Sequence, residues 1–181
     1  MRVLGISGSL RRDSYNSGLL RAAADLLPSG VELEVFDGLK GIPPYDADDD
    51  VSPAPAPVAA LREAIESADG VLIATPEYNA SIPGVLKNAL DWASRPFPDN
   101  ALRGMPVAVV GASTGLFGAV WAQAEARKVL SALGANVIDA ELPVGLADGA
   151  FDETGALLDP ELAERLRGHV IALAGERVMV A

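Results

Sequence analysis

The strongest constraint on the fold of this chain is a regular alternation of short apolar runs with longer helical patterns. The apolar runs, which predict strands, cover residues 2–7, 31–36, 70–75, 106–111 and 136–144. The helical patterns cover residues 17–27, 56–68, 82–94, 118–133 and 160–175. The third and fourth runs are rich in Val, Ile, Leu and Ala without polar alternation, as expected for strands buried on both faces. The alternation predicts an α/β fold in which helices cover a parallel sheet.

The composition narrows the classes of function. The chain has 181 residues, 50% of them hydrophobic, so we expect one domain over residues 1–181. Its net charge of −11 argues against nucleic acids and anionic membrane surfaces as partners. The absence of cysteine excludes disulfides, thiolate catalysis and thiolate metal ligands. We expect no metal site, and we expect the lone His169 to be a packing or surface residue. We also expect a cytoplasmic location, since no targeting or membrane-spanning pattern is visible.

The turn after the first predicted strand, residues 8–17, has the composition of an anion site. A helix start leaves backbone N–H groups free and carries the positive end of the helix dipole. Short donors and one guanidinium surround this helix start, at Ser9, Arg11, Ser14, Asn16 and Ser17. Because neither the Walker pattern nor the dinucleotide fingerprint is present here, a terminal phosphate monoester fits best. The alternative is an ordinary strand-to-helix turn with Asn16 or Ser17 as the N-cap.

A second unusual loop, residues 75–83, follows the third predicted strand. In an open parallel sheet, ligands bind beyond the carboxyl ends of the strands where the strand order reverses, which for the order 2-1-3-4-5 is between strands one and three. Tyr78 offers an aromatic ring there, and the loop leaves backbone donors and acceptors free for a planar heterocycle. The alternative is a turn capped by Ser81, with Pro83 in the first turn of the next helix.

The two motifs together resemble those of the NADPH-dependent FMN reductase family, which includes flavodoxin-like quinone, azo-dye and chromate reductases. The first motif is Gly8-Ser9-Leu10-Arg11 with Ser14 and Asn16. The second is Pro76-Glu77-Tyr78-Asn79, followed by Ser81, Pro83 and residues 86–92. The resemblance implies a flavodoxin-like three-layer sandwich, with a five-stranded parallel sheet in the order 2-1-3-4-5 and helices on both faces.

The resemblance also implies a set of cofactor-binding residues. The FMN phosphate would be held by Ser9, Arg11, Ser14, Asn16 and Ser17. The isoalloxazine would be lined by Pro76, Glu77, Tyr78 and Asn79, chiefly through the backbone, and by a third loop at Ser113, Thr114 and Gly115. No side chain is expected to be catalytic, because the redox chemistry takes place on the FMN ring.

The activity that the resemblance implies is an FMN-dependent NAD(P)H oxidoreductase with ping-pong kinetics. NADPH or NADH would be the donor, and quinones, azo compounds, chromate-like oxyanions or free flavin would be the acceptors. Two alternatives stay open: an electron carrier without its own NAD(P)H reaction, and a flavin reductase that uses FMN as a substrate. A receiver domain shares the fold, but the places of its acidic residues are taken by Ser7-Gly8-Ser9 and Thr75-Pro76.

By the same resemblance we expect a homodimer, or a homotetramer. Exposed aromatic and arginine side chains favour interfaces, so the candidate interface residues are Trp92, Arg95, Pro96 and Phe97. The proline-rich acidic segment at 43–57 is expected to be a solvated connector.

Overall fold

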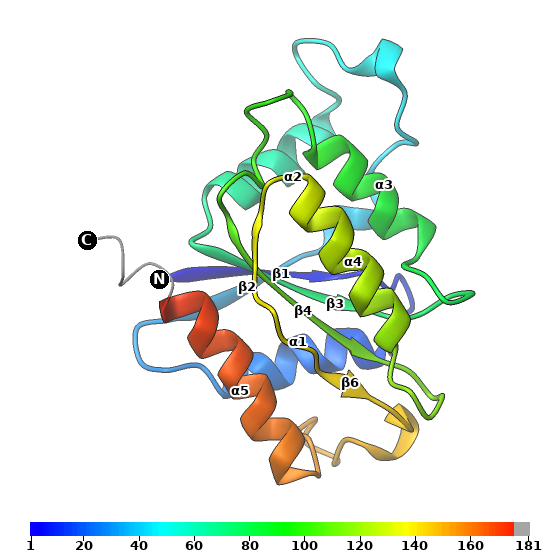
Figure 1. Cartoon of the computed structure of the whole chain (residues 1–181), viewed down its shortest axis with the longest axis vertical. Coiled ribbons are helices and arrows are strands. Elements are labelled where there is room, and N and C mark those ends of the chain that lie inside the picture. Colours follow the sequence, from blue (N-terminus) through cyan, green and yellow to red (C-terminus); the bar gives the residue numbers. More distant parts are fainter. Residues whose placement is uncertain (176–181) are drawn as a thin grey trace.

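A parallel sheet forms the middle layer of the molecule, and helices cover both of its faces (Figure 1). The structure is a computed structural model that describes residues 1–175. The strands are β1 (Arg2–Ser7), β2 (Glu32–Phe36), β3 (Gly70–Thr75), β4 (Pro106–Ala112), β5 (Asn136–Val137) and β6 (Pro143–Val144). The helices are α1 (Tyr15–Asp25), α2 (Ala56–Glu66), α3 (Gly84–Ala93), α4 (Val120–Ala132) and α5 (Pro160–Gly175), with short 3₁₀ turns η1 (Gly38–Gly41), η2 (Ala47–Asp49) and η3 (Ala147–Gly149).

The strand order is β2-β1-β3-β4-β5, and every pair is parallel. This confirms the predicted order 2-1-3-4-5 and the flavodoxin-like architecture. The order reverses between β1 and β3, so the loops that follow these two strands open onto the same edge of the sheet. Among residues 1–175, no helix is both long enough and apolar enough to cross a membrane.

The two central strands divide their side chains between two hydrophobic cores. Val71 and Ile73 of β3 pack with α2, α3 and α4, whereas Leu72 and Ala74 pack with α1 and α5. Every residue of β3 and β4 is buried. A strand covered by helices on both faces needs apolar residues at every position, which is why these two runs lack the alternation of a half-exposed strand.

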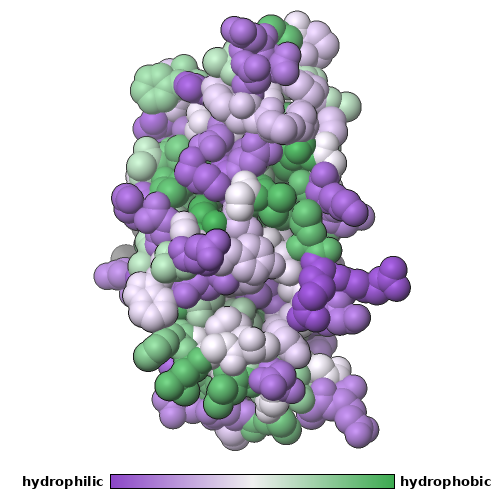
Figure 2. Space-filling model, turned by 90° about the vertical axis from the view of Figure 1, so that its right-hand side faces the viewer, coloured by the Kyte–Doolittle hydropathy of each residue, from purple (hydrophilic) through white to green (hydrophobic). Residues whose placement is uncertain are grey.

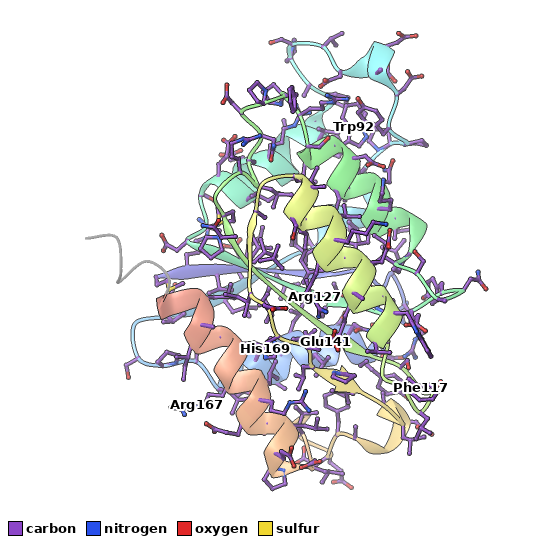
Figure 3. All side chains as sticks on the ribbon, viewed as in Figure 1. Trp92, Phe117, Arg127, Glu141, Arg167 and His169 are labelled. Atoms are coloured by element: carbon purple, nitrogen blue, oxygen red, sulfur yellow. The ribbon has the colours of Figure 1, made fainter. Side chains whose placement is uncertain are left out.

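The prediction of one continuous strand over residues 136–144 is wrong. Only Asn136–Val137 pairs with β4 at first, and the chain rejoins β4 at Pro143–Val144. Between these two short strands, side chains of α4 form hydrogen bonds with backbone groups that are not paired with β4. The Arg127 guanidinium donates to the carbonyl of Ala140, and the Gln123 side chain accepts from the N–H of Leu142. Arg127 also pairs with the carboxylate of Glu141, which lies close to it in Figure 3.

Trp92 is not available as an interface residue, which corrects the prediction. Its side chain is fully buried in the core between α2 and α3, near the top of Figure 3. Its Nε1–H donates to the carbonyl of Pro43 at 2.8 Å, and its ring meets that of Tyr45 edge to face at 4.9 Å. Asn88 donates to the same carbonyl and accepts from the N–H of Tyr45. The segment predicted as a solvated connector is therefore fixed to α3 at its first residues.

Candidate functional site

Three loops at the carboxyl ends of β1, β3 and β4 enclose a cleft of about 330 Å³. Its lining residues are Ser9, Arg11, Ser14, Tyr15, Asn16, Pro76, Glu77, Tyr78, Ala112, Ser113 and Thr114. Figure 2 shows the side of the molecule onto which these loops open, where hydrophilic and hydrophobic residues are interspersed. The cleft has the position expected for a ligand site in an open parallel sheet.

The first wall of the cleft is the turn between β1 and α1. Ser14 is the N-cap of α1, not Asn16 or Ser17 as the alternative interpretation of this turn supposed. The helix begins at Tyr15, whereas the predicted helical pattern began at residue 17. The Ser14 hydroxyl oxygen accepts from the N–H groups of Asn16 and Ser17, at 3.2 and 3.4 Å. A hydroxyl that accepts in this way keeps its own O–H free to donate. Ser14 can therefore cap the helix and bind an acceptor in the cleft at once.

The same turn packs closely against the loop that follows β3. The N–H of Gly8 donates to the carbonyl of Ala74 at 2.8 Å and so extends the pairing of β1 with β3 by one residue. A Cβ atom at position 8 would lie 3.1 Å from the side chain of Leu86 and 3.3 Å from that of Pro76. Glycine at this position therefore lets the two loops approach each other closely.

One positive charge lies at the cleft, on Arg11. Its guanidinium carbon is 5.0 Å from the centre of the Tyr15 ring, and that ring stacks on Phe151 with an interplanar angle of 7°. The Tyr15 ring therefore contacts both the cation and a second aromatic ring. No salt bridge to Arg11 is found among residues 1–175. The charge is thus available to an anion.

The second wall is the loop from Pro76 to Ser81. Tyr78 and Ser81 exchange two backbone hydrogen bonds of 3.0 and 3.2 Å, so the loop closes on itself as a tight turn. The two residues at its tip, Asn79 and Ala80, have φ of 54° and 61°, as in the type I′ turns of hairpins. The Tyr78 side chain is 55% exposed beside the cleft. Pro83 is the N-cap of α3, and Ser81 does not cap it as the alternative interpretation supposed.

The third wall follows β4 and rests on the segment around β6. The N–H of Ser113 donates to the carbonyl of Val144, and the N–H of Leu146 donates to that of Gly115. A Cβ atom at Gly118, where φ is 57°, would lie 2.5 Å from the carbonyl carbon of Pro143. The loop can lie this close to β6 only because a glycine stands at the contact.

The structure brings nine of the twelve predicted cofactor-binding residues into the lining of the cleft. These nine are Ser9, Arg11, Ser14, Asn16, Pro76, Glu77, Tyr78, Ser113 and Thr114. Ser17 is elsewhere: its hydroxyl donates to that of Ser7 at 3.0 Å, and it lines a separate hollow with Lys40. Asn79 and Gly115 belong to the second and third loops but do not line the cleft.

Two lining residues, Tyr15 and Ala112, are absent from the sequence-based prediction. Tyr15 stands inside the first motif, and an aromatic residue between two polar ones is a signal that could have been used. Ala112 carries no such signal, because it is the last residue of an apolar strand. The Asn16 amide donates to its carbonyl and accepts from its N–H, both at 2.9 Å.

The comparisons with known proteins agree with this geometry. The sequence model of the NADPH-dependent FMN reductase family matches residues 1–149. An NAD(P)H-dependent FMN reductase of Pseudomonas aeruginosa is 45% identical over 174 residues, which are 96% of this chain and 93% of that protein. A quinone reductase of Escherichia coli is 39% identical over 175 residues, which are 95% of this chain and 93% of that protein.

A solved structure extends the likeness from sequence to fold. FerB, a flavoenzyme NAD(P)H:(acceptor) oxidoreductase from Paracoccus denitrificans, superposes with a TM-score of 0.82 at 36% identity. The match covers 95% of this chain and 94% of FerB. With the family model matching most of its length and relatives of this identity, the chain belongs to the NADPH-dependent FMN reductase family.

Proposed function

We propose that this protein is an FMN-dependent NAD(P)H oxidoreductase that passes two electrons from NADPH or NADH to small-molecule acceptors. The observation that carries the proposal is the convergence of three loops on one cleft. The cleft has hydroxyls on one wall, together with a guanidinium that forms no salt bridge within the described part of the chain, and backbone groups with an exposed tyrosine on another. Membership of the NADPH-dependent FMN reductase family supports the same activity.

The residues of the cleft fit FMN by their chemistry. Arg11 and the hydroxyls of Ser9 and Ser14 are donors suited to a phosphate, and they stand at the N-terminal end of α1, where the helix dipole favours an anion. Pro76 and Tyr78 offer backbone groups and an apolar surface suited to a flat ring. The cleft volume of about 330 Å³ lies within the range of small-molecule sites.

In this proposal the protein binds and orients, and no side chain takes part in covalent chemistry. When bound, FMN supplies the redox chemistry, because it takes up two electrons from the nicotinamide donor and gives them to the acceptor. Arg11, Ser9 and Ser14 hold the phosphate end and thereby fix the position of the cofactor along the cleft. The loops at 76–78 and 113–114 would orient the ring, and the exposed Tyr78 side chain beside the cleft would be available to pack against it.

The acceptor is proposed as a quinone. The relatives in Pseudomonas aeruginosa and Escherichia coli are named an FMN reductase and a quinone reductase. A further relative from Burkholderia is named a 2-hydroxy-1,4-benzoquinone reductase and is 46% identical over 133 residues, 74% of this chain. Azo compounds, chromate-like oxyanions and free flavin stay as further acceptors to be tested.

We also propose that the protein forms a homodimer in the cytoplasm. Phe97 supports an interface near the end of α3, since 74% of its side chain is exposed. A second exposed apolar group consists of Leu116, Phe117, Trp121 and Leu146, on the side of the molecule where Figure 3 labels Phe117. Exposed apolar groups of this kind favour association. Sedimentation of the wild-type protein would test the dimer. The same measurement on Phe97→Ser and on Phe117→Ser would show which of the two exposed apolar sites forms the interface.

The test of the activity is a visible spectrum of the protein after reconstitution with FMN and desalting, followed by anaerobic addition of NADPH or NADH and then of a soluble quinone. Retained flavin colour that bleaches with a nicotinamide and returns with the quinone supports the proposal. Retained colour that does not bleach indicates an electron carrier. Nicotinamide oxidation that needs added free FMN indicates that FMN is a substrate, and no response in any arm refutes the activity.

A further inference from the structure

The start of α4 lacks a cap of its own. Ser, Thr, Asp or Asn usually stands at an N-cap and accepts from a first-turn N–H, whereas here the N-cap is Ala119, with φ of 61° and a methyl side chain. The missing acceptor comes from the second wall of the cleft. Oε2 of Glu77 accepts from the N–H of Ala122 at 3.0 Å, across 45 residues of sequence. Ala122 is the third residue of α4, the position that an N-cap side chain normally serves.

This contact also reduces the repulsion between the Glu77 carboxylate and an anion bound in the cleft. Glu77 lines the cleft and would repel a phosphorylated ligand if its charge were uncompensated. The N-terminal end of α4 carries the positive end of the helix dipole, which offsets the carboxylate charge within the first turn. The hydrogen bond therefore serves both the helix and the cleft.

The start of α4, where Glu77 binds the N–H of Ala122, is held firmly by its surroundings. Ala119 and Ala122 are 1% and 0% exposed, and Gly118 packs directly against Pro143 of β6. Glu77 lies between Pro76 and Tyr78, both of which line the cleft. The Pro76–Tyr78 backbone is thus tied through one side chain to a buried point at the start of α4, the helix that follows β4.

We propose that Glu77 is a positioning residue for the flavin. By capping α4 from the β3–α3 loop, its carboxylate holds the backbone of residues 76–78 at a fixed separation from the loop after β4, and so sets the width of the cleft around the ring. This inference rests on the proposed FMN-dependent function. It assigns the Glu77 side chain to α4, whereas the resemblance implied that this residue acts chiefly through its backbone.

The test compares Glu77→Ala with Glu77→Gln, because an amide oxygen can still accept from the N–H of Ala122. Two control variants show whether an effect arises from the loss of any carboxylate on α4 or from a general loss of stability. Glu125→Ala removes an α4 carboxylate that forms a salt bridge with Lys128 at the surface, and Asn100→Ala removes a buried side chain that stabilises the turn before β4. The measurements are hydrogen exchange of the Ala122 amide without FMN, FMN affinity by flavin fluorescence, and the visible spectrum of the bound flavin.

We expect Glu77→Ala to speed exchange at Ala122, to weaken FMN binding about five- to tenfold, and to change the flavin absorption bands. Glu77→Gln should restore slow exchange and affinity to within about twofold. Asn100→Ala should lower stability without changing the flavin spectrum. Should Glu77→Ala exchange faster but bind FMN with wild-type affinity and spectrum, the cap does not set the cleft and the inference is wrong.

Two further outcomes are distinguishable. If the wild-type protein and Glu125→Ala both fail to bind FMN, the proposed function is wrong and this inference falls with it. If Glu77→Ala does not fold, Glu77→Gln and Glu77→Asp decide the matter, because the aspartate keeps the charge but is one methylene shorter. Wild-type affinity and spectrum in the aspartate variant, with fast exchange at Ala122, would again overturn the inference.

Discussion

The side-chain amide of Asn16 pairs with the backbone of Ala112 as a neighbouring strand would, donating to its carbonyl and accepting from its N–H at 2.9 Å each. Asn16 is in the first turn of α1, and Ala112 is the last residue of β4. The side chain of Asn16 is 3% exposed. The pair therefore joins the first and third walls of the cleft. It satisfies both backbone groups of Ala112, which lies one residue beyond Gly111, where the pairing of β4 with β3 ends.

Asn16→Ala should destabilise the protein without FMN by about 2–4 kcal/mol, because it leaves the N–H and the carbonyl of Ala112 buried without a partner. Urea unfolding measures the loss. Asn16→Asp is the matched control, since it keeps one acceptor of the same shape but places a carboxylate against the carbonyl. A cost below about 1 kcal/mol for the alanine variant would show that water replaces the amide.

Arg11→Ala should weaken FMN binding by about 1.5–3 kcal/mol, roughly ten- to a hundredfold, because it removes a charge-assisted hydrogen bond to the phosphate. Fluorescence titration with FMN measures the change, and riboflavin, which lacks the phosphate, should show no difference between wild type and variant. Arg12→Ala is the control, since Arg12 does not line the cleft. Unchanged FMN affinity in Arg11→Ala would remove this residue from the site.

Trp92→Ala should cost about 3–5 kcal/mol of stability, because a fully buried ring is lost from the core between α2 and α3. Trp92→Phe should cost less, although it leaves the Pro43 carbonyl with one donor fewer, that of Asn88 remaining. Thermal unfolding measures both. Sedimentation of Trp92→Phe provides the contrast with an interface role, since the folded variant should keep the oligomeric state of the wild type.

Acidification should remove a small stabilising contribution from Asp152. Hydrogen bonds from the Thr154 side chain and from nearby backbone N–H groups hold the pKa of Asp152 below its ordinary value of 3.8. A group whose pKa is lower in the folded state stabilises the protein above the unfolded value, and this is lost as the pH falls through the folded value. In Asp152→Asn the urea midpoint should therefore fall less between about pH 7 and pH 3 than in wild type. An equal fall of the urea midpoint in Asp152→Asn and in wild type would contradict this prediction. Asp49→Asn, which changes another exposed aspartate, is the control.

The fold could be predicted because its signals are local. The apolar runs that became β3 and β4 are continuous, since helices bury them on both faces, and the βα alternation leaves few topologies open. The segment at 136–144 could not be assigned in the same way. Its composition suits a strand, but Arg127 and Gln123 of α4 bind its backbone and draw the middle of it away from β4.

The amino-acid sequence alone determined the alternation of strands and helices, the two motifs at the carboxyl edge and most of the residues that line the cleft, because glycine turns, helix starts and apolar runs act over a few residues. The strand order was expected from the resemblance of these motifs to those of a known family. Only the tertiary structure decided how those loops are joined. The Asn16–Ala112 and Glu77–Ala122 contacts span 96 and 45 residues, and the burial of Trp92 depends on Pro43 and Tyr45 of another segment. Such pairings are set by packing in three dimensions, where one partner is a backbone group that every residue carries and that no sequence pattern marks.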